Sequence, residues 1–110
     1  MEITTRDYKR VSVIRVTGRI DSTTAPQFEG KLNDHIKNGH IHLVLEMDGA
    51  DYLSSAGVRT LISTQKTLKG KGGEVTLAQP SPRVKEVLEL AGLGPLFHIY
   101  DKTEAAVGEA

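Results

Sequence analysis

The segment Ile41–Met47 constrains the fold more than any other part of the chain. It is a short, almost continuously apolar run, and polar residues bound it on both sides. A run of this length and character is typical of a strand that is buried on both faces, as strands are in a parallel sheet. The run therefore predicts that the chain folds around a mostly parallel sheet.

An antiparallel hairpin is expected in front of this strand. The segments Ile3–Tyr8 and Val11–Thr17 are rich in β-branched residues, and only two basic residues separate them. Such residues favour strands, and two strands joined by so short a connection pair with each other. Gly18 is expected to end the second strand.

Helices and strands alternate along the rest of the sequence. Helices are expected at about Pro26–Lys37, Ser55–Leu68, Pro82–Ala91 and Lys102–Val107, strands at Glu74–Ala78 and Leu96–Tyr100, and a loop at Asp48–Ser54. Thr24 with Gln27 fits a capping box for the first helix, and Ser81 with Pro82 fits a capped start for the third. The chain thus predicts an α/β fold with about four helices and a sheet that is fronted by the hairpin.

Length and composition indicate how many domains the chain forms and which classes of function are excluded. The chain has 110 residues, so residues 1–110 are expected to form one domain. Its 14 basic and 14 acidic residues give no net charge, which argues against general binding to nucleic acid. No run is apolar enough to enter a membrane and no secretory leader is visible, so a cytoplasmic protein is expected.

Few residues offer metal or cofactor chemistry. The chain has no cysteine, and its four histidines lie at positions 35, 40, 42 and 98 without the spacing of a zinc site. The glycine-rich segment Gly70–Gly73 follows a predicted helix instead of preceding one, so its amides are not placed to hold a phosphate. We expect no metal and no cofactor.

The segment Asp51–Arg59 joins the buried strand to the second helix, where open α/β sheets place functional residues. Its adjacent serines, Ser54 and Ser55, allow three interpretations. In the first, Ser54 caps the helix, and Ser55, Ala56 and Gly57 are small because another element packs closely there. In the second, one serine is a catalytic nucleophile, and in the third, one serine accepts a phosphate. Leu53 stands where a nucleophile elbow needs glycine, which argues against a serine hydrolase. A phosphate would suit a helix N-terminus and would disrupt a partner docked over it.

Here the sequence resembles the STAS-domain anti-anti-sigma factors, also called anti-sigma factor antagonists. The resemblance rests on an ordered set of segments, namely Val13–Asp21, Tyr52–Val58, Gly72–Leu77, Ser81–Lys85 and Leu90–Leu93. It covers nearly the whole chain and implies a single STAS domain.

The resemblance implies a switch rather than an enzyme. In the family, a serine-kinase anti-sigma factor binds the unphosphorylated antagonist, which frees the sigma factor. The kinase phosphorylates one serine of the antagonist, and a metal-dependent phosphatase resets it. Carried over by position, the acceptor is Ser55, with Ser54 as the alternative. The implied partner-binding residues are Asp21, Ser22, Ser54, Ser55, Ala56, Gly57 and Arg59.

Within that set, Asp21 matches the acidic residue of the neighbouring loop, and Gly57 matches the glycine that lets the partner approach. Arg59 is either a solvated helix residue or a partner for the phosphate. Two positions depart from the family pattern: Ser54 replaces the usual acidic residue, and Ala56 the usual hydroxyl. Two other functions stay open. One is a constitutive STAS interaction subunit of a signalling or transport complex, and the other is a small-ligand or nucleotide-binding domain.

Overall fold

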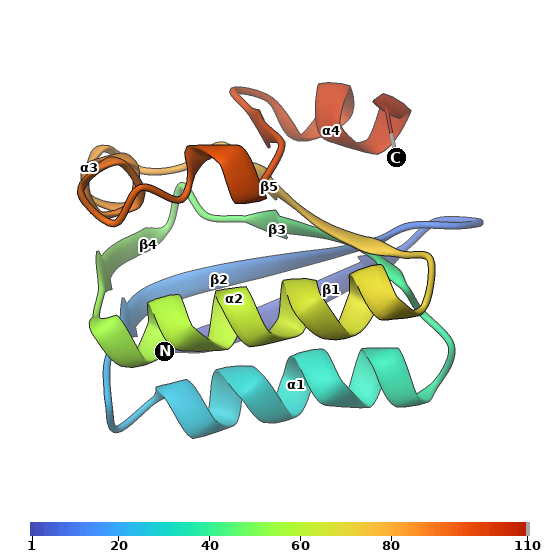
Figure 1. Ribbon diagram of the computed structural model, residues 1–110, viewed down its shortest axis with the longest axis horizontal. Coiled ribbons are helices and arrows are strands. Elements are labelled where there is room, and N and C mark those ends of the chain that lie inside the picture. The colour runs from blue at the N-terminus through green and yellow to red at the C-terminus, as the bar shows by residue number, and fades with distance from the viewer. Residues whose placement is uncertain (110) are drawn as a thin grey trace.

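A six-stranded sheet runs through the molecule, and the computed structural model describes residues 1–109 of it (Figure 1). The strands are β1 (Glu2–Asp7), β2 (Ser12–Ile20), β3 (His42–Glu46), β4 (Ala50–Leu53), β5 (Glu74–Ala78) and β6 (Ile99–Tyr100). The helices are α1 (Ala25–Lys37), α2 (Ser55–Gly70), α3 (Pro82–Leu90) and α4 (Thr103–Glu109), with a 3₁₀ turn η1 (Gly94–Leu96). The predicted α/β fold with four helices is confirmed.

Strand β2 organises the sheet because it pairs with three other strands. The order across the sheet is β1-β2-β3-β5-β6, with β1 antiparallel to β2 and the following pairs parallel. The first half of β2 pairs with β3, whereas its last residues pair with β4. The register shifts between Gly18 and Arg19, and Gly18 has a φ of 100°. The predicted hairpin and parallel sheet are therefore confirmed.

Two expectations about this region are wrong. Gly18 does not end β2, because its left-handed backbone forms an irregularity that redirects the strand onto β4 and lets it continue to Ile20. Asp48–Ser54 is not only a loop, because Ala50–Leu53 forms β4. The two aspartates and the glycine around this strand are typical of a turn, which hides it in the sequence.

Both faces of the central strands are buried. On one face, Leu43 and Leu45 of β3 join the main core with residues of α1, α2 and α3. On the other face, Val44 packs in a smaller cluster with Ala106 of α4. Figure 1 shows α1 and α2 on one side of the sheet and α4 on the other. The interpretation of Ile41–Met47 as a doubly buried strand is confirmed.

The buried carboxylate of Glu46, on β3, bonds to side chains of β1, β2 and α4. Glu46 accepts hydrogen bonds from Arg6 at 3.2 Å, from Arg15 at 3.0 Å and from the hydroxyl of Thr103. Burial acts to raise the pKa of Glu46, but these hydrogen bonds and the arginine charges outweigh it and hold that pKa below its ordinary value. The carboxylate therefore stays ionised and links β1, β2 and α4 to β3.

The last predicted strand is shorter than expected. Instead of a strand at Leu96–Tyr100, the chain forms the turn η1 and then a strand of two residues. Because β6 pairs only with Leu77 and Ala78, the start of β5 has no strand beside it on that side. The buried side chain of Gln65 fills the gap: its amide accepts from Val75 N at 2.7 Å and donates to Val75 O at 3.2 Å and Leu96 O at 2.8 Å. An amide on the apolar stripe of α2 thus replaces a missing strand.

Replacing this amide is expected to destabilise the fold. Gln65→Leu leaves three backbone groups without their partner, so the free energy of unfolding should fall by about 3 kcal/mol in urea denaturation. The exposed Gln27 is the control, and Gln27→Leu should change that energy by less than about 0.5 kcal/mol. Equal effects of the two substitutions would contradict the bridging role.

Candidate functional site

The helices α1 and α2 pack side by side and begin at the same end of the molecule (Figure 1). The loops that precede them also meet there, because Ser54 N donates to Ile20 O at 2.8 Å. The N-terminus of a helix carries unpaired amide groups and the positive end of the helix dipole. Two such ends therefore lie together beside the Asp21–Thr24 and Ser54–Ser55 segments.

Ser54 caps α2. Its backbone is extended, with φ −88° and ψ 173°, and its hydroxyl accepts a hydrogen bond from Gly57 N at 3.4 Å. This confirms the interpretation in which Ser54 is the helix cap. The hydroxyl is thus engaged by the fold.

Ser55 is the first residue of α2 and is exposed. The first turn of α2 contains no acidic residue, so no carboxylate occupies the positive end of the helix. A negative group attached to the Ser55 hydroxyl would lie at this end, where the helix dipole stabilises it.

Gly57 has a packing role at the start of α2. It is buried, and a Cβ at this position would lie 2.6 Å from Leu53 Cδ1 and 2.7 Å from Ile20 Cγ2. Its missing side chain lets α2 approach the ends of β2 and β4. This confirms the interpretation in which the small residues at the helix start allow close packing, while contact of Gly57 with a partner stays a prediction.

Asp21 shapes the loop in front of α1. Its Oδ1 accepts hydrogen bonds from Thr23 N at 2.9 Å and Thr24 N at 3.0 Å, and Arg19 lies 3.6 Å from its Oδ2. The backbone amide of Thr24 contributes most to holding the pKa of Asp21 below its ordinary value. The expected capping box at Thr24 and Gln27 is wrong, since the Thr24 hydroxyl donates to Arg19 O and leaves α1 without a side-chain cap.

The other predicted residues line a shallow hollow between α1 and α2. Ser22 and Ala56 face it from the two helix starts, and Arg59 faces it from the second turn of α2. Ser22 and Arg59 are exposed. The fold thus gathers Asp21, Ser22, Ala56 and Arg59 around one end of the helix pair, and leaves Gly57 beneath them.

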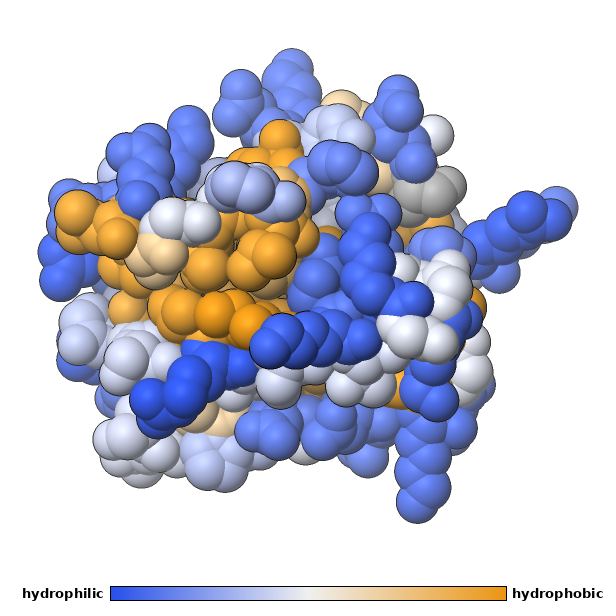
Figure 2. Space-filling model, in the orientation of Figure 1, coloured by the Kyte–Doolittle hydropathy of each residue, from blue (hydrophilic) through white to orange (hydrophobic). Residues whose placement is uncertain are grey.

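Ser55 borders a second feature, an apolar groove between α2 and α3. We call it the α2–α3 groove, and it is lined by Ser55, Val58, Val87, Leu90 and Ala91. Leu90 is 81% exposed, the largest exposed fraction among the large exposed apolar side chains of residues 1–109. In Figure 2 an apolar patch covers the surface between α2 and α3. Large apolar side chains gathered at the surface mark interaction sites.

The α2–α3 groove was missed in the sequence, although one signal was present. The apolar stripe of α3 includes Val84 and Leu88, both buried. Leu90 lies off this stripe, near the end of the helix. Single exposed apolar residues are common, so Leu90 points to an interaction surface only together with the groove that it lines.

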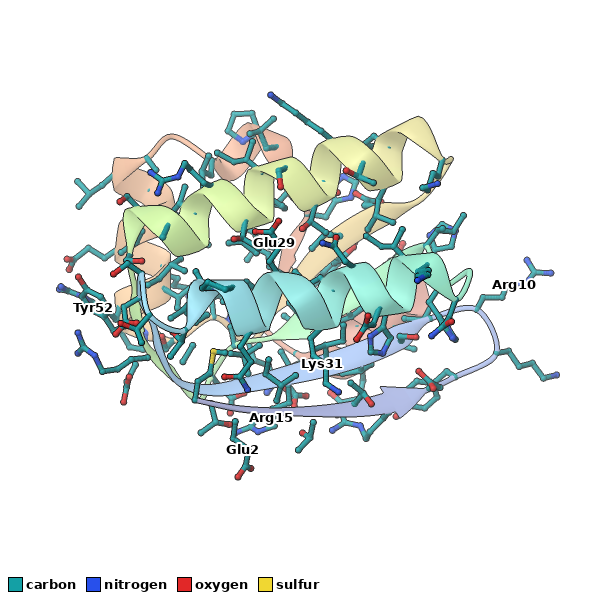
Figure 3. The ribbon with its side chains drawn as sticks, turned by 90° about the horizontal axis from the view of Figure 1, so that it is seen from below. Glu2, Arg10, Arg15, Glu29, Lys31 and Tyr52 are labelled. Carbon is teal, nitrogen blue, oxygen red and sulfur yellow. The ribbon has the colours of Figure 1, made fainter. Side chains whose placement is uncertain are left out.

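A stacked group of side chains lies next to the same end of the molecule. The guanidinium carbon of Arg19 lies 4.1 Å from the ring centre of Tyr52, and that of Arg83 lies 5.7 Å from it. Figure 3 shows Tyr52 at the end where α1 and α2 begin. The cation–π contacts fix Tyr52, on β4, two residues before the Ser54 cap.

The described part of the chain offers neither a cluster of metal-binding side chains nor a helix that could cross a membrane. Residues 1–109 contain no cluster of three or more histidine, cysteine, aspartate or glutamate side chains suited to a metal ion. Within the same residues, every helix is too short or too polar to cross a membrane.

Comparisons with known proteins agree on one family. The family model described as the STAS domain matches residues 2–106. A putative anti-sigma factor antagonist of Bordetella bronchiseptica, BtrV, is 31% identical, over 96% of this chain and 91% of that protein. The crystal structure of an anti-sigma factor antagonist from Mycobacterium paratuberculosis is 27% identical, with a TM-score of 0.90 over 98% of this chain and 92% of that one. The unphosphorylated antagonist SpoIIAA shares the fold, with 24% identity and a TM-score of 0.84 over 98% of this chain and 95% of that one.

The packing role of Gly57 can be tested against Gly30, since both lie in helices. Gly57→Ala should lower the free energy of unfolding by about 1–3 kcal/mol, because the new methyl group overlaps Leu53 and Ile20. No atom lies within 4 Å of a Cβ at Gly30, so Gly30→Ala should raise that energy by about 0.5–1 kcal/mol. A stabilising Gly57→Ala would show that the close contact is absent.

Proposed function

This chain belongs to the STAS domain family of anti-sigma factor antagonists, and we propose that its unphosphorylated form binds a serine-kinase anti-sigma factor through the start of α2. Binding frees the sigma factor that the kinase otherwise holds. Phosphorylation of Ser55 ends the interaction, and a metal-dependent serine phosphatase restores it. Antagonists of this family are regulatory proteins and not enzymes. We propose that this protein acts in the cytoplasm.

The position of Ser55 carries the proposal. Its hydroxyl is exposed at the start of α2, whereas that of Ser54 accepts the capping hydrogen bond from Gly57 N. A kinase can therefore reach Ser55 without opening the helix cap. This difference supports Ser55 as the acceptor over Ser54.

A phosphate at Ser55 affects the chain and its partner differently. The group carries a charge of about −1.5 to −2 at neutral pH, and the helix dipole stabilises it within this chain. The same charge would enter the α2–α3 groove, which Ser55 borders beside Val58 and Leu90. An apolar partner surface docked in that groove would lose its contacts to a strongly hydrated dianion. The switch thus works through desolvation and needs no change of fold.

The two surfaces at this end would contribute different kinds of contact to the partner. The α2–α3 groove supplies apolar area, and the hollow beside Ser22 and Arg59 supplies polar contacts. An apolar centre with a polar rim is the usual build of a protein–protein interface. The partner surface therefore extends over both sides of the start of α2.

The acceptor can be identified by peptide mapping. Incubation with ATP and the serine-kinase anti-sigma factor of the same organism should add one phosphate, located on Ser55 by mass spectrometry. Ser55→Ala should abolish the incorporation. Ser54→Ala should keep it, with a loss of stability of about 1 kcal/mol from the missing cap.

Other outcomes of that experiment are equally informative. Phosphate on Ser54 would move the acceptor by one residue. If the kinase binds the chain but phosphorylates neither serine, the chain is a constitutive interaction subunit instead of a switch.

The contribution of the α2–α3 groove can be measured separately. Leu90→Ala should weaken binding of the kinase at least tenfold, because burying this exposed leucine side chain against the partner would contribute about 1.5 kcal/mol or more. Its effect on stability should be small, since Leu90 is 81% exposed in the free chain. Leu96→Ala is the matched control: Leu96 is also exposed, at 47%, but does not line the groove. Calorimetric titration showing equal affinities for both variants would contradict the docking role.

A further inference from the structure

The long free edge of the sheet, strand β1, points to a second interaction surface that is separate from the start of α2. We propose that two copies of this chain pair through β1 in one antiparallel register, with Glu2 of each copy beside Arg6 of the other. The sheet would then continue from one copy into the next across a two-fold axis at Thr4. None of the residues that line the α2–α3 groove belongs to this strand.

Strand β1 pairs with β2 alone and lies at the end of the strand order. Its six residues pair with β2 without a break in register, and the strand contains no proline. Proteins usually protect such an edge with bulges, prolines, covering elements or charged side chains, because its free amide groups can pair with another strand. Strand β1 has charges of both signs, so these charges can attract a second copy in a register that pairs them. In Figure 3, β1 is the outermost strand, and α1 lies over one face of the sheet rather than over the edge. The edge is therefore open to a further strand.

The hydrogen-bond pattern shows which residues face that edge. Tyr8 N donates to Val11 O at 2.8 Å next to the hairpin turn, so Tyr8 and Val11 form a hydrogen-bonded pair. Hydrogen-bonded and non-hydrogen-bonded pairs alternate along an antiparallel ladder. Along the register of β1 with β2, this alternation turns the amide groups of Ile3, Thr5 and Asp7 away from β2. These three residues can bond to a second strand.

Charge selects one register from those that this pattern allows. When the axis lies at Thr4, Ile3 faces Thr5 of the other copy, and their outward amide groups can bond. Glu2 then faces Arg6 of the other copy, once on each side of the axis. When the axis lies at Thr5 instead, Ile3 faces Asp7 and both charge pairs are lost. Opposite charges across a strand pair stabilise it, and the self-complementary contact has the form of a two-fold dimer.

The side chains of Glu2 and Arg6 are accessible to a second copy of the chain. Within residues 1–109 Glu2 makes no ion pair, and it is exposed. Arg6 is held to Glu46 at 3.2 Å, but 49% of its side chain is exposed, so a second carboxylate can reach it. Its contact with Glu46 fixes Arg6 on the face of the sheet to which Glu2 and Thr4 also belong, since residues two apart in a strand share a face.

Sedimentation equilibrium of the full chain tests the dimer directly. The interface is small, so concentrations from about 10 μM to 1 mM are needed. We expect a reversible dimer whose dissociation constant rises with sodium chloride, because exposed ion pairs are screened by salt. A monomer over the whole range would overturn the proposal.

A charge-reversed variant tests the register. Glu2→Lys places a lysine beside Arg6 of the other copy and should raise the dissociation constant at least tenfold. Glu29→Lys makes the same change on α1, away from β1 in Figure 3, and should leave that constant unchanged. Circular dichroism should show both variants to be folded. A dimer weakened equally by both variants, or by neither, would overturn the proposed pairing.

A cysteine at the axis gives a second, independent test. The chain has no cysteine, so Thr4→Cys introduces a single thiol. In the proposed register the two copies of this residue lie about 4.5 Å apart between Cα atoms, within disulfide range. Diamide, which accepts the two electrons and two protons of the thiols, should convert this variant to a covalent dimer. Thr17→Cys, exposed on β2, is the control. Equal cross-linking of both variants would contradict an axis at Thr4.

Discussion

The close contact of Gly57 with Ile20 and Leu53 is the constraint on which the proposed site depends. These two side chains end β2 and β4, and a Cβ on residue 57 would overlap both of them. Without a side chain there, α2 begins directly against the sheet, and the bond from Ser54 N to Ile20 O can form. The starts of α1 and α2 then lie side by side. Ser55 is therefore held at the surface by packing beneath it and not by contacts of its own.

The irregularity at Gly18 provides the other half of this arrangement. Because β2 leaves β3 at that point and continues along β4, its last residues reach the strand that leads into α2. Strand β2 itself leads, through the Asp21 loop, into α1. A single redirected strand thus brings two loops, two helix ends and the α2–α3 groove to one end of the molecule. The opposite side of β2 carries β1, which leaves the long edge of the sheet free.

Much of this could be predicted from the sequence, for identifiable reasons. The buried strand β3, the hairpin and the long helices follow from strong local periodicity, and Ser54 and Ser81 follow from capping chemistry. The resemblance to anti-sigma factor antagonists located the site at the start of α2. Strand β4 was missed because its flanking residues favour turns. The extent of β6 was overestimated because a tertiary contact, the amide of Gln65, takes the place of its first residues.

The site residues were only partly predictable because their roles depend on which way they face. The sequence allows Gly57 either to admit a partner or to admit a neighbouring element, and the fold buries it against Ile20 and Leu53. In the sequence, Leu90 is marked only as part of a motif, and its 81% exposure follows from where α3 ends relative to α2. Orientation of this kind is set by the packing of elements that are distant in sequence. Local patterns do not contain it.

The central claim is that charge at the start of α2 decides whether the partner binds. The most direct measurement is the dissociation constant of the serine-kinase anti-sigma factor for the unphosphorylated chain and for the chain carrying one phosphate on Ser55. The account predicts that the phosphate weakens binding at least tenfold, while amide chemical shifts away from the start of α2 stay the same. Equal affinities of the two forms would contradict it.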